Sequence, residues 1–171
     1  MTDVRVQRED FDAGVEAAAL ARRHKDVGAI VSFVGYCRDE GGRLAALELE
    51  HYPGMAEEEM ARVAREAETR WPLISVKAIH RYGRIAPGER IVLIAVAAAH
   101  RGDAFAAAEM LMDYLKTRAP FWKRAIRADG VVEGWVDAKG EDDESAARWA
   151  QPAPDGDFRF SPRPRGRSRA R

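Results

Sequence analysis

A run of ten residues, RIVLIAVAAA (90–99), is strongly apolar and contains several β-branched side chains. Such a run predicts a buried strand, and it is too short to cross a bilayer. Polar HRGD follows at once, and Asp103 is a good N-cap for a helix expected from about Ala104 to Thr117. Pro120 cannot continue a helix, because it lacks a backbone N–H. The chain is therefore expected to hold a buried strand followed directly by a helix.

Periodicity and turn residues predict the remaining elements. Further strands are expected at 27–38, 43–52, 73–83, 121–127 and 131–138, and further helices at 10–24 and 55–71. The turn DEGG (39–42) joins the strands 27–38 and 43–52, which predicts a hairpin. Because hairpins dominate this order, the sequence predicts a two-layer α+β domain with a mainly antiparallel sheet.

Helical spacing also predicts which side chains are buried. In the helix 55–71 the expected apolar stripe is Met60, Val63, Ala64, Ala67 and Trp71. In the helix 104–117 it is Phe105, Ala108, Leu111 and Leu115, while Lys116 shares a different face with Met112 and Asp113.

Length and charge limit the organisation of the chain. With 171 residues, 46% of them hydrophobic, one domain is expected over residues 1–149, followed by a Pro/Arg-rich tail (150–171) expected to be disordered. From Gln151 onward there are six arginines against two aspartates, a net charge of +4, so the first 150 residues carry −4. An acidic body argues against a nucleic-acid-binding domain. The N-terminus has no apolar signal region, so a cytoplasmic protein is expected.

Cysteine and histidine usage excludes several kinds of site. Cys37 is the single cysteine, so the chain has no internal disulfide, and at the end of an apolar strand it is more often a packing residue than a nucleophile. The histidines at 24, 51, 80 and 100 lack metal-ligand spacing. No metal and no cofactor are therefore expected.

Basic residues at strand ends form a candidate anion site. His100 and Arg101 stand where the apolar strand ends and the helix begins, and free backbone N–H groups at a helix start favour a phosphate. Arg38 follows another apolar strand, so the two arginines could converge on one anionic ligand. The alternative for Arg101 is that it simply leaves the sheet for water.

Two lysines flank an aromatic pair in LKTRAPFWKRA (115–125). Beside Phe121 and Trp122 the ammonium of Lys123 is partly desolvated, which suits a lysine to proton transfer. The alternative for Lys123 is cation–π packing, with its stem lying along apolar surface. The alternative for Lys116 is an ion pair with Asp113 or Glu109 near the helix C-terminus.

Five motifs, FVGYCR, LELEHYPGM, HRYGRIAPGE, AAHRGDAF and MDYLKTRAPFWKR, resemble the large, catalytic subunit of molybdopterin synthase, in the same order, and the likeness reaches about Trp149. The resemblance implies an α/β hammerhead-type fold and a sulfur transfer. A small ubiquitin-like carrier subunit would bring sulfur as a thiocarboxylate on its C-terminal glycine. Transfer to cyclic pyranopterin monophosphate would form the dithiolene of molybdopterin. The resemblance also implies a homodimer within a heterotetramer, with each pocket borrowing residues from the neighbouring large subunit.

The resemblance assigns roles residue by residue. It implies that Lys116 and Lys123 are catalytic, and that the substrate-binding residues are these lysines with Tyr36, Cys37, Arg38, His100, Arg101, Arg124 and Ala125. It also implies that Lys139 reaches across the dimer and that Phe33 and Met112 form an apolar wall. Our hypothesis makes Lys123 the general acid/base and Lys116 the residue that holds the carrier's terminal carboxylate or sulfur, although the two roles could be exchanged.

One position departs from the family pattern. The family usually has FWKRE or FWKKE, whereas this chain has FWKRA, with Ala125 in place of the acid. Glu133 or Asp137 could supply the missing carboxylate. The departure leaves open a non-catalytic module that docks a ubiquitin-like tail, and the arginine-rich tail leaves open polyanion binding.

Overall fold

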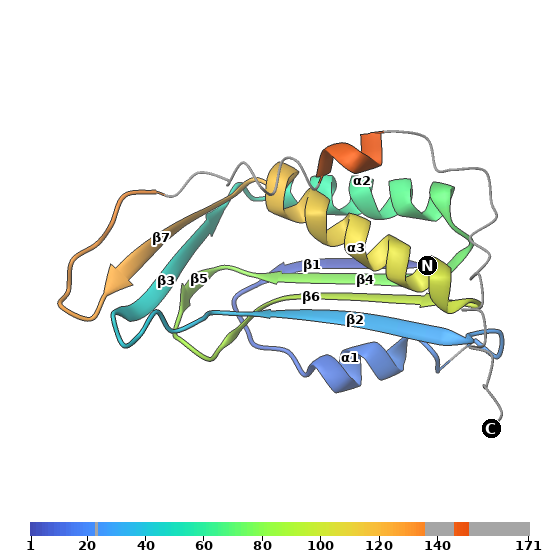
Figure 1. Cartoon of the computed structure of the whole chain (residues 1–171), viewed down its shortest axis with the longest axis horizontal. Helices are drawn as coiled ribbons and strands as arrows, with labels where there is room; N and C mark the ends of the chain where they lie inside the picture. The colour runs from blue at the N-terminus through green and yellow to red at the C-terminus, as the bar shows by residue number, and fades with distance from the viewer. Residues whose placement is uncertain (23, 136–145, 151–171) are drawn as a thin grey trace, which may run out of the picture.

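The computed structural model describes residues 1–22, 24–135 and 146–150. Seven strands form two sheets (Figure 1). The main sheet has four strands in the order β1 (Thr2–Gln7), β4 (Leu73–Arg81), β6 (Arg90–Ala98) and β2 (Ala29–Tyr36). The second sheet has the order β5 (Gly83–Ile85), β3 (Leu44–His51) and β7 (Phe121–Arg127). Only β1 and β4 pair in parallel in the described residues, so the predicted α+β class with mainly antiparallel strands is confirmed.

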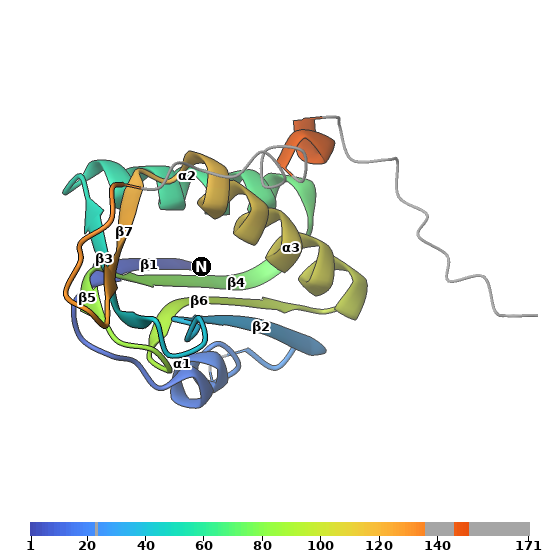
Figure 2. The same ribbon diagram turned by 60° about the vertical axis from the view of Figure 1, so that its left-hand side comes forward.

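Helices cover both faces of the main sheet. The helices α2 (Met55–Arg70) and α3 (Arg101–Arg118) lie on one face, and the shorter α1 (Ala13–Ala19) lies on the other (Figure 1). Figure 2 shows the second sheet standing across one end of the main sheet. A 3₁₀ turn (Arg148–Ala150) lies near α2 and α3. None of the described helices is long and apolar enough to span a membrane.

The strand β6 is apolar throughout because it is covered on both faces. Ile94, Val96 and Ala98 belong to the core beneath α2 and α3, whereas the alternate residues Leu93, Ala95 and Ala97 belong to the core beside α1. A strand that is buried on both faces reads as a continuous apolar run rather than as an alternation. This position in the fold explains RIVLIAVAAA.

Helix burial is mostly as predicted, with one error. Met60, Val63, Ala64 and Ala67 of α2 are fully buried, and Trp71 is half-buried. In α3 the buried residues are Ala104, Ala107, Ala108, Met110, Leu111, Tyr114 and Leu115. The prediction for Phe105 is wrong, because this side chain is 62% exposed. In the first turns of α3 the buried residues are instead the alanines Ala104, Ala107 and Ala108.

The start of α3 also differs from the prediction. The helix begins at Arg101 with His100 as its N-cap residue, and Asp103 lies inside the first turn. The His100 side chain makes no capping hydrogen bond. Asp103 still places a negative charge near the positive end of the helix dipole, which is favourable without a capping bond.

The predicted hairpin is wrong. β2 pairs with β6 of the main sheet, whereas β3 pairs with β5 and β7 of the second sheet. Cys37 holds the end of β2 in place, because its N–H donates to the Glu89 carbonyl at 2.8 Å and its carbonyl accepts from Gly88 N–H at 2.8 Å. The chain leaves the main sheet after Cys37, so the turn signal at 39–42 marks a change of sheet.

Three other strand predictions need correction. β1 was not predicted, and it pairs with β4 through register partners such as Val4 and Ala78. The predicted strand 73–83 is divided between the sheets as β4 and β5, and Gly83 adopts a left-handed φ of 90° at the break. Of the predicted strand 131–138, the described part forms a single bridge from Val132 to Ile126, and residues 136–138 lie outside the described residues. The predicted tail, apart from Ala150, also lies outside them.

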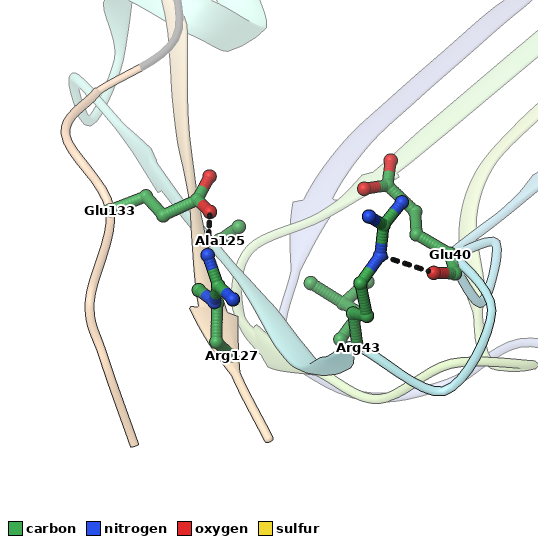
Figure 3. A pocket seen from close by; sticks show the side chains of 6 residues that line it. Glu40, Arg43, Ala125, Arg127 and Glu133 are labelled. Carbon is green, nitrogen blue, oxygen red and sulfur yellow. Dashed lines mark hydrogen bonds and ion pairs between the residues drawn. The ribbon is translucent and has the colours of Figure 1, made fainter. Parts of the chain in front are cut away.

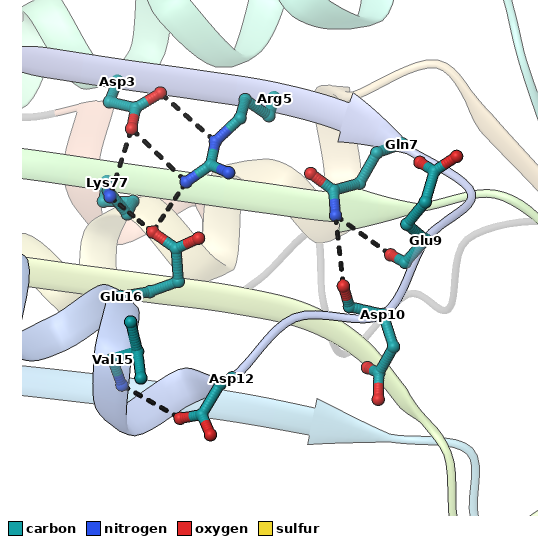
Figure 4. Close-up of polar contacts among 9 residues, drawn as sticks. All are labelled: Asp3, Arg5, Gln7, Glu9, Asp10, Asp12, Val15, Glu16 and Lys77. Carbon is teal, nitrogen blue, oxygen red and sulfur yellow. Dashed lines mark hydrogen bonds and ion pairs between the residues drawn. The ribbon is translucent and has the colours of Figure 1, made fainter.

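A polar network attaches α1 to the main sheet (Figure 4). The buried Lys77 of β4 binds Glu16 of α1 at 2.5 Å and Asp3 of β1 at 3.2 Å. Arg5 also binds Glu16, at 2.7 Å. Burial alone would raise the pKa of Glu16, but the hydrogen bonds from Arg5 and Lys77 outweigh it and lower that pKa below its ordinary value of 4.5. Glu16 is therefore the common acceptor for two cations.

Glu16→Ala is expected to lower the free energy of unfolding by about 3 kcal/mol at pH 7, because it leaves the buried Lys77 ammonium without its nearest carboxylate. Urea unfolding measures this, with the exposed Glu9→Ala as the control. A lowered folded-state pKa contributes stability above the unfolded value and loses it as the pH falls through the folded value. The difference between wild type and Glu16→Ala should therefore shrink below about pH 4.5. An undiminished difference in acid would contradict the electrostatic origin.

Candidate active site

The junction between α3 and β7 carries both candidate lysines. α3 runs back over the main sheet from the end of β6 to the second sheet, where β7 begins (Figure 1). Lys116 lies in the last turn of α3 and Lys123 lies in β7, and both side chains are exposed. Pro120 stands between the two elements, so the chain turns from helix to strand within a few residues. Both ammonium groups are accessible from solvent at one end of the molecule.

The register of β7 determines which of its side chains share a face. Lys123 lies opposite Leu49 of β3, and Ala125 lies opposite Leu47, whereas Arg124 lies opposite Glu48. Leu49 is buried, so the face with Lys123 and Ala125 is turned toward the apolar core. Arg124 therefore lies on the other face of β7 from Lys123.

The segment after β2 reaches the same region through a small apolar core. Cys37 is 1% exposed and packs with Leu44, Leu49 and Ile85, and Ala125 packs against this cluster. Tyr36 and Arg38, on either side of Cys37, are exposed. The cluster therefore brings the segment 36–38 to the face of the second sheet that carries Lys123. Burial raises the pKa of the Cys37 thiol, so Cys37 is a packing residue rather than a thiolate nucleophile.

Arg124 is held in a separate network. Its guanidinium binds Glu48 at 2.6 Å and lies over the Trp135 ring at 4.6 Å from the centroid. A cation that is paired and stacked in this way is less available to an anionic ligand. The structure places Arg124 beside the predicted site but on the opposite face of the strand.

Ala125 lines a cavity of about 240 Å³ at the second sheet (Figure 3). The other lining residues are Glu40, Arg43, Leu44, Arg127 and Glu133. The Glu133 N–H donates to the Ala125 carbonyl at 2.9 Å, and the Glu133 carboxylate lies 3.8 Å from the Arg127 guanidinium. A carboxylate is therefore present next to Ala125, and it comes from Glu133. The other predicted substitute, Asp137, lies outside the described residues.

The structure places His100 and Arg101 at the opposite end of the molecule. In the β2–β6 pair, Ala29 lies opposite Ala98 and Tyr36 lies opposite Arg90, so the two ends of β6 are about 26 Å apart. Along α3, Arg101 and Lys116 are separated by about 22 Å of helix rise. A single chain therefore does not bring the two predicted groups of cations together.

The other residues predicted for the site are Phe33, Met112 and Lys139. Phe33 is 41% exposed on β2, one of the two edge strands of the main sheet. Met112 is partly buried on α3, one turn before Lys116, and packs against the main core. Lys139 lies outside the described residues. No group of three or more potential metal ligands is found among the residues that the structure describes.

The acids predicted to pair with Lys116 bind another residue. Arg148 binds Glu109 at 2.9 Å and Asp113 at 2.7 Å, and the Trp149 indole N–H also donates to Asp113 at 2.7 Å. These contacts attach residues 148 and 149 to α3 and show that Asp113 serves the packing of the chain. Nothing in the sequence spacing connects these distant residues.

Two histidines at the junction were not predicted to belong to it. His80 of β4 stacks on Phe121, and His51 of β3 lies opposite Phe121 in the strand register. The only sequence signal is that His51 lies within the motif LELEHYPGM and His80 within HRYGRIAPGE. Their meeting at Phe121 depends on the pairing of the sheets, which a linear motif does not reveal.

Comparison with known proteins identifies the family. The MoaE protein family model matches residues 6–118. The molybdopterin synthase catalytic subunit of Mesorhizobium japonicum is 61% identical over 146 residues, which cover 85% of this chain and 92% of that protein. The corresponding subunit of Brucella melitensis is 56% identical over 149 residues, covering 87% of this chain and 91% of that protein.

Solved structures agree with the sequence comparison. The molybdopterin biosynthesis MoaE protein of Burkholderia ambifaria is 50% identical with a TM-score of 0.76, and the match covers 88% of this chain and 99% of that one. A molybdopterin synthase structure from Staphylococcus aureus is 31% identical with a TM-score of 0.70, covering 77% and 95%. The resemblance seen in the sequence motifs is confirmed, and the chain belongs to the MoaE family.

Proposed function

We propose that this chain is the cytoplasmic catalytic subunit of a molybdopterin synthase in molybdenum cofactor biosynthesis. It accepts sulfur from the C-terminal thiocarboxylate of a small ubiquitin-like carrier and transfers it to cyclic pyranopterin monophosphate, forming the dithiolene of molybdopterin. The observation that carries this proposal is the arrangement of exposed Lys116 and Lys123 around one helix–strand junction. The extended tail of a carrier can reach such a site because both lysines face solvent.

The two lysines supply what the transfer needs. When the thiocarboxylate sulfur attacks the pterin, a C–S bond forms as an oxygen leaves, and the departing oxygen requires a proton and stabilisation of negative charge. Water then cleaves the bond between that sulfur and the carrier's carbonyl carbon, which leaves the sulfur on the pterin and a carboxylate on the carrier. We assign the proton transfer to Lys123, on the face of β7 nearest the segment 36–38. Lys116 then holds the terminal carboxylate or sulfur of the carrier. Arg38, exposed at the end of the same segment, provides a fixed cation for the anionic substrate.

A second copy of the chain completes the pocket in this proposal. His100 and Arg101 suit a phosphate, but about 22 Å of helix separates Arg101 from Lys116, which exceeds the size of a pterin monophosphate. The exposed Phe33 on the edge strand β2 and the exposed Phe105 on α3 offer apolar surface for a second copy. In such a homodimer, His100 and Arg101 of one chain meet the lysines of the other, and one carrier at each end gives a heterotetramer.

Reconstituted turnover tests the proposed function. Purified protein is mixed with thiocarboxylated carrier and cyclic pyranopterin monophosphate, and the dithiolene product is measured. Product formation is expected. Carrier binding without product would favour the non-catalytic docking module instead. Polyanion binding that disappears when residues 151–171 are deleted would favour the alternative role of the arginine-rich tail.

Glu133 is expected to replace the acid that position 125 lacks. The Glu133 backbone N–H donates a hydrogen bond to the Ala125 carbonyl. Ala125 lies two residues beyond Lys123 on the same face of β7. Glu133→Ala is therefore expected to lower turnover on the order of tenfold, because a carboxylate that orients an active-site cation is lost. Adding Ala125→Glu to Glu133→Ala should restore most of the activity.

Steady-state turnover of both variants measures this effect, with Glu58→Ala on the exposed face of α2 as the control. Normal turnover of Glu133→Ala, or failure of Ala125→Glu to restore a reduced rate, would show that Glu133 does not take this role.

A further inference from the structure

Phe121, the first residue of β7, is contacted by histidines from both sheets. The rings of His80 and Phe121 are stacked, with centroids 3.7 Å apart and planes inclined by 17°. His51 lies opposite Phe121 in the β3–β7 register, with ring centroids 6.2 Å apart. His80 belongs to the main sheet and His51 to the second sheet. The Phe121 ring therefore lies where the two sheets meet.

The two histidines are themselves held in fixed orientations. The Nδ1 atom of His80 lies 2.9 Å from the Arg81 carbonyl, which orients the ring when Nδ1–H donates. Burial lowers the pKa of His80 to about 4, so the ring that stacks on Phe121 is neutral near pH 7. His51 packs edge-on against Tyr82, with centroids 4.4 Å apart. Its Nδ1 atom is buried and has no hydrogen-bond partner among the described residues, so aromatic packing is what places this ring.

Phe121 is the point at which the chain passes from the end of α3 into β7. Pro120 has no N–H to bond, and the Phe121 N–H donates to the nearby Ala119 carbonyl at 2.8 Å. That short local bond reaches neither sheet. Phe121 is instead held on two sides, because its backbone pairs with His51 of β3 and its ring stacks on His80 of β4. It lies two residues before Lys123 and five after Lys116, so a shift of Phe121 away from the main sheet would be passed to the segment that carries both lysines.

We propose that His80 and His51 are positioning residues for sulfur transfer, which hold Phe121 between the two sheets and so keep Lys123 in place relative to Lys116. This inference rests on the proposed function of the two lysines. Neither histidine touches the substrate or exchanges a proton. Each acts through the ring of Phe121, and the shape and packing of an aromatic ring, not its charge, are what the position requires.

The test compares His80→Ala with His80→Phe in the complete enzyme. His80→Ala removes the stacked ring and is expected to lower kcat ten- to a hundredfold, since small displacements of reacting groups have effects of this size. The Kd for the carrier should change less than about twofold, because the lysines themselves remain. His80→Phe keeps a ring at the position and should retain kcat within about threefold. Ile79→Val is the matched control, because Ile79 is buried in the core on the other face of β4.

Hydrogen exchange gives a second measurement that does not depend on turnover. Amide exchange at residues 121–123 should accelerate at least about tenfold in His80→Ala and remain unchanged in Ile79→Val. If His80→Ala does not fold, His51→Ala at its half-buried position carries the same test.

Two results would overturn the proposal. One is a wild-type kcat and wild-type exchange in His80→Ala. The other is an equal loss in His80→Phe, which would assign the effect to the imidazole rather than to ring packing. Failure of the proposed function is distinguishable, because the wild type would then form no product. Failure of the lysine assignment alone would leave Lys123→Ala active. In both cases the exchange measurement still reports on the junction.

Discussion

Replacing Lys123 with alanine is expected to lower dithiolene formation by at least about a hundredfold, the usual contribution of a positioned proton-transfer group. Lys123 is exposed on β7 and opposite Leu49, so its removal leaves no buried charge and opens no core cavity. The protein should therefore fold normally and still bind the carrier. The loss should appear in the single-turnover rate constant for sulfur transfer, measured at saturating carrier and substrate.

The companion variant Lys116→Ala separates the two roles. If Lys116 holds the carrier's terminal carboxylate or sulfur, its loss should weaken carrier binding as well as slow transfer. Lys25→Ala, which removes an exposed lysine far along the chain from both sites, is the control for a general loss of positive charge. A binding defect in Lys123→Ala and not in Lys116→Ala would exchange the two assignments. Near-normal product formation by both variants would show that the lysines are not the catalytic groups.

Elements with a strong local signal could be predicted from the sequence. The period of α2 and the apolar run of β6 are properties of neighbouring residues, and both are found as predicted. The partner of a strand is a different kind of information. The turn at 39–42 predicted that β2 and β3 pair, but β2 pairs with β6 at an edge of the main sheet, where its apolar side chains are only partly buried, while β3 joins the second sheet. β1 was missed because its alternation of Val4 and Val6 with polar residues is very short, and its place depends on pairing with the distant β4.

In the candidate site, too, local sequence signals could be interpreted, whereas contacts that depend on strand pairing could not. Lys116 and Lys123 lie close together in the sequence, and the motif around them was sufficient to propose them as the catalytic groups. Arg38 and Arg101 both follow apolar strands, and the sequence could not show that β2 and β6 run antiparallel and so carry them to opposite ends of the main sheet. The junction histidines were missed for the related reason that His51 and His80 meet at Phe121 only after both sheets have formed.

The separation of Arg101 from Lys116 leads to the second large effect, in a hybrid dimer. A Lys116→Ala chain is paired with a chain that carries His100→Ala and Arg101→Ala, and each parent homodimer is expected to retain no more than a few per cent of wild-type turnover. If each pocket takes its lysines from one chain and its phosphate-binding residues from the other, one pocket of the hybrid collects both defects and the other collects none. A hybrid purified through two different affinity tags should then recover about half of the wild-type turnover.

No such recovery is possible if each pocket is built from one chain, because every chain in the hybrid carries a defect. The hybrid should then remain as inactive as its parents. Carrier binding by the hybrid controls for correct assembly, and a wild-type dimer carrying the same two tags gives the reference rate. About 22 Å of helix between the two groups of cations favours recovery, since no bending of side chains can close that distance within one subunit. The arrangement would also couple activity to assembly, because a single subunit would hold lysines without a phosphate site and a phosphate site without lysines.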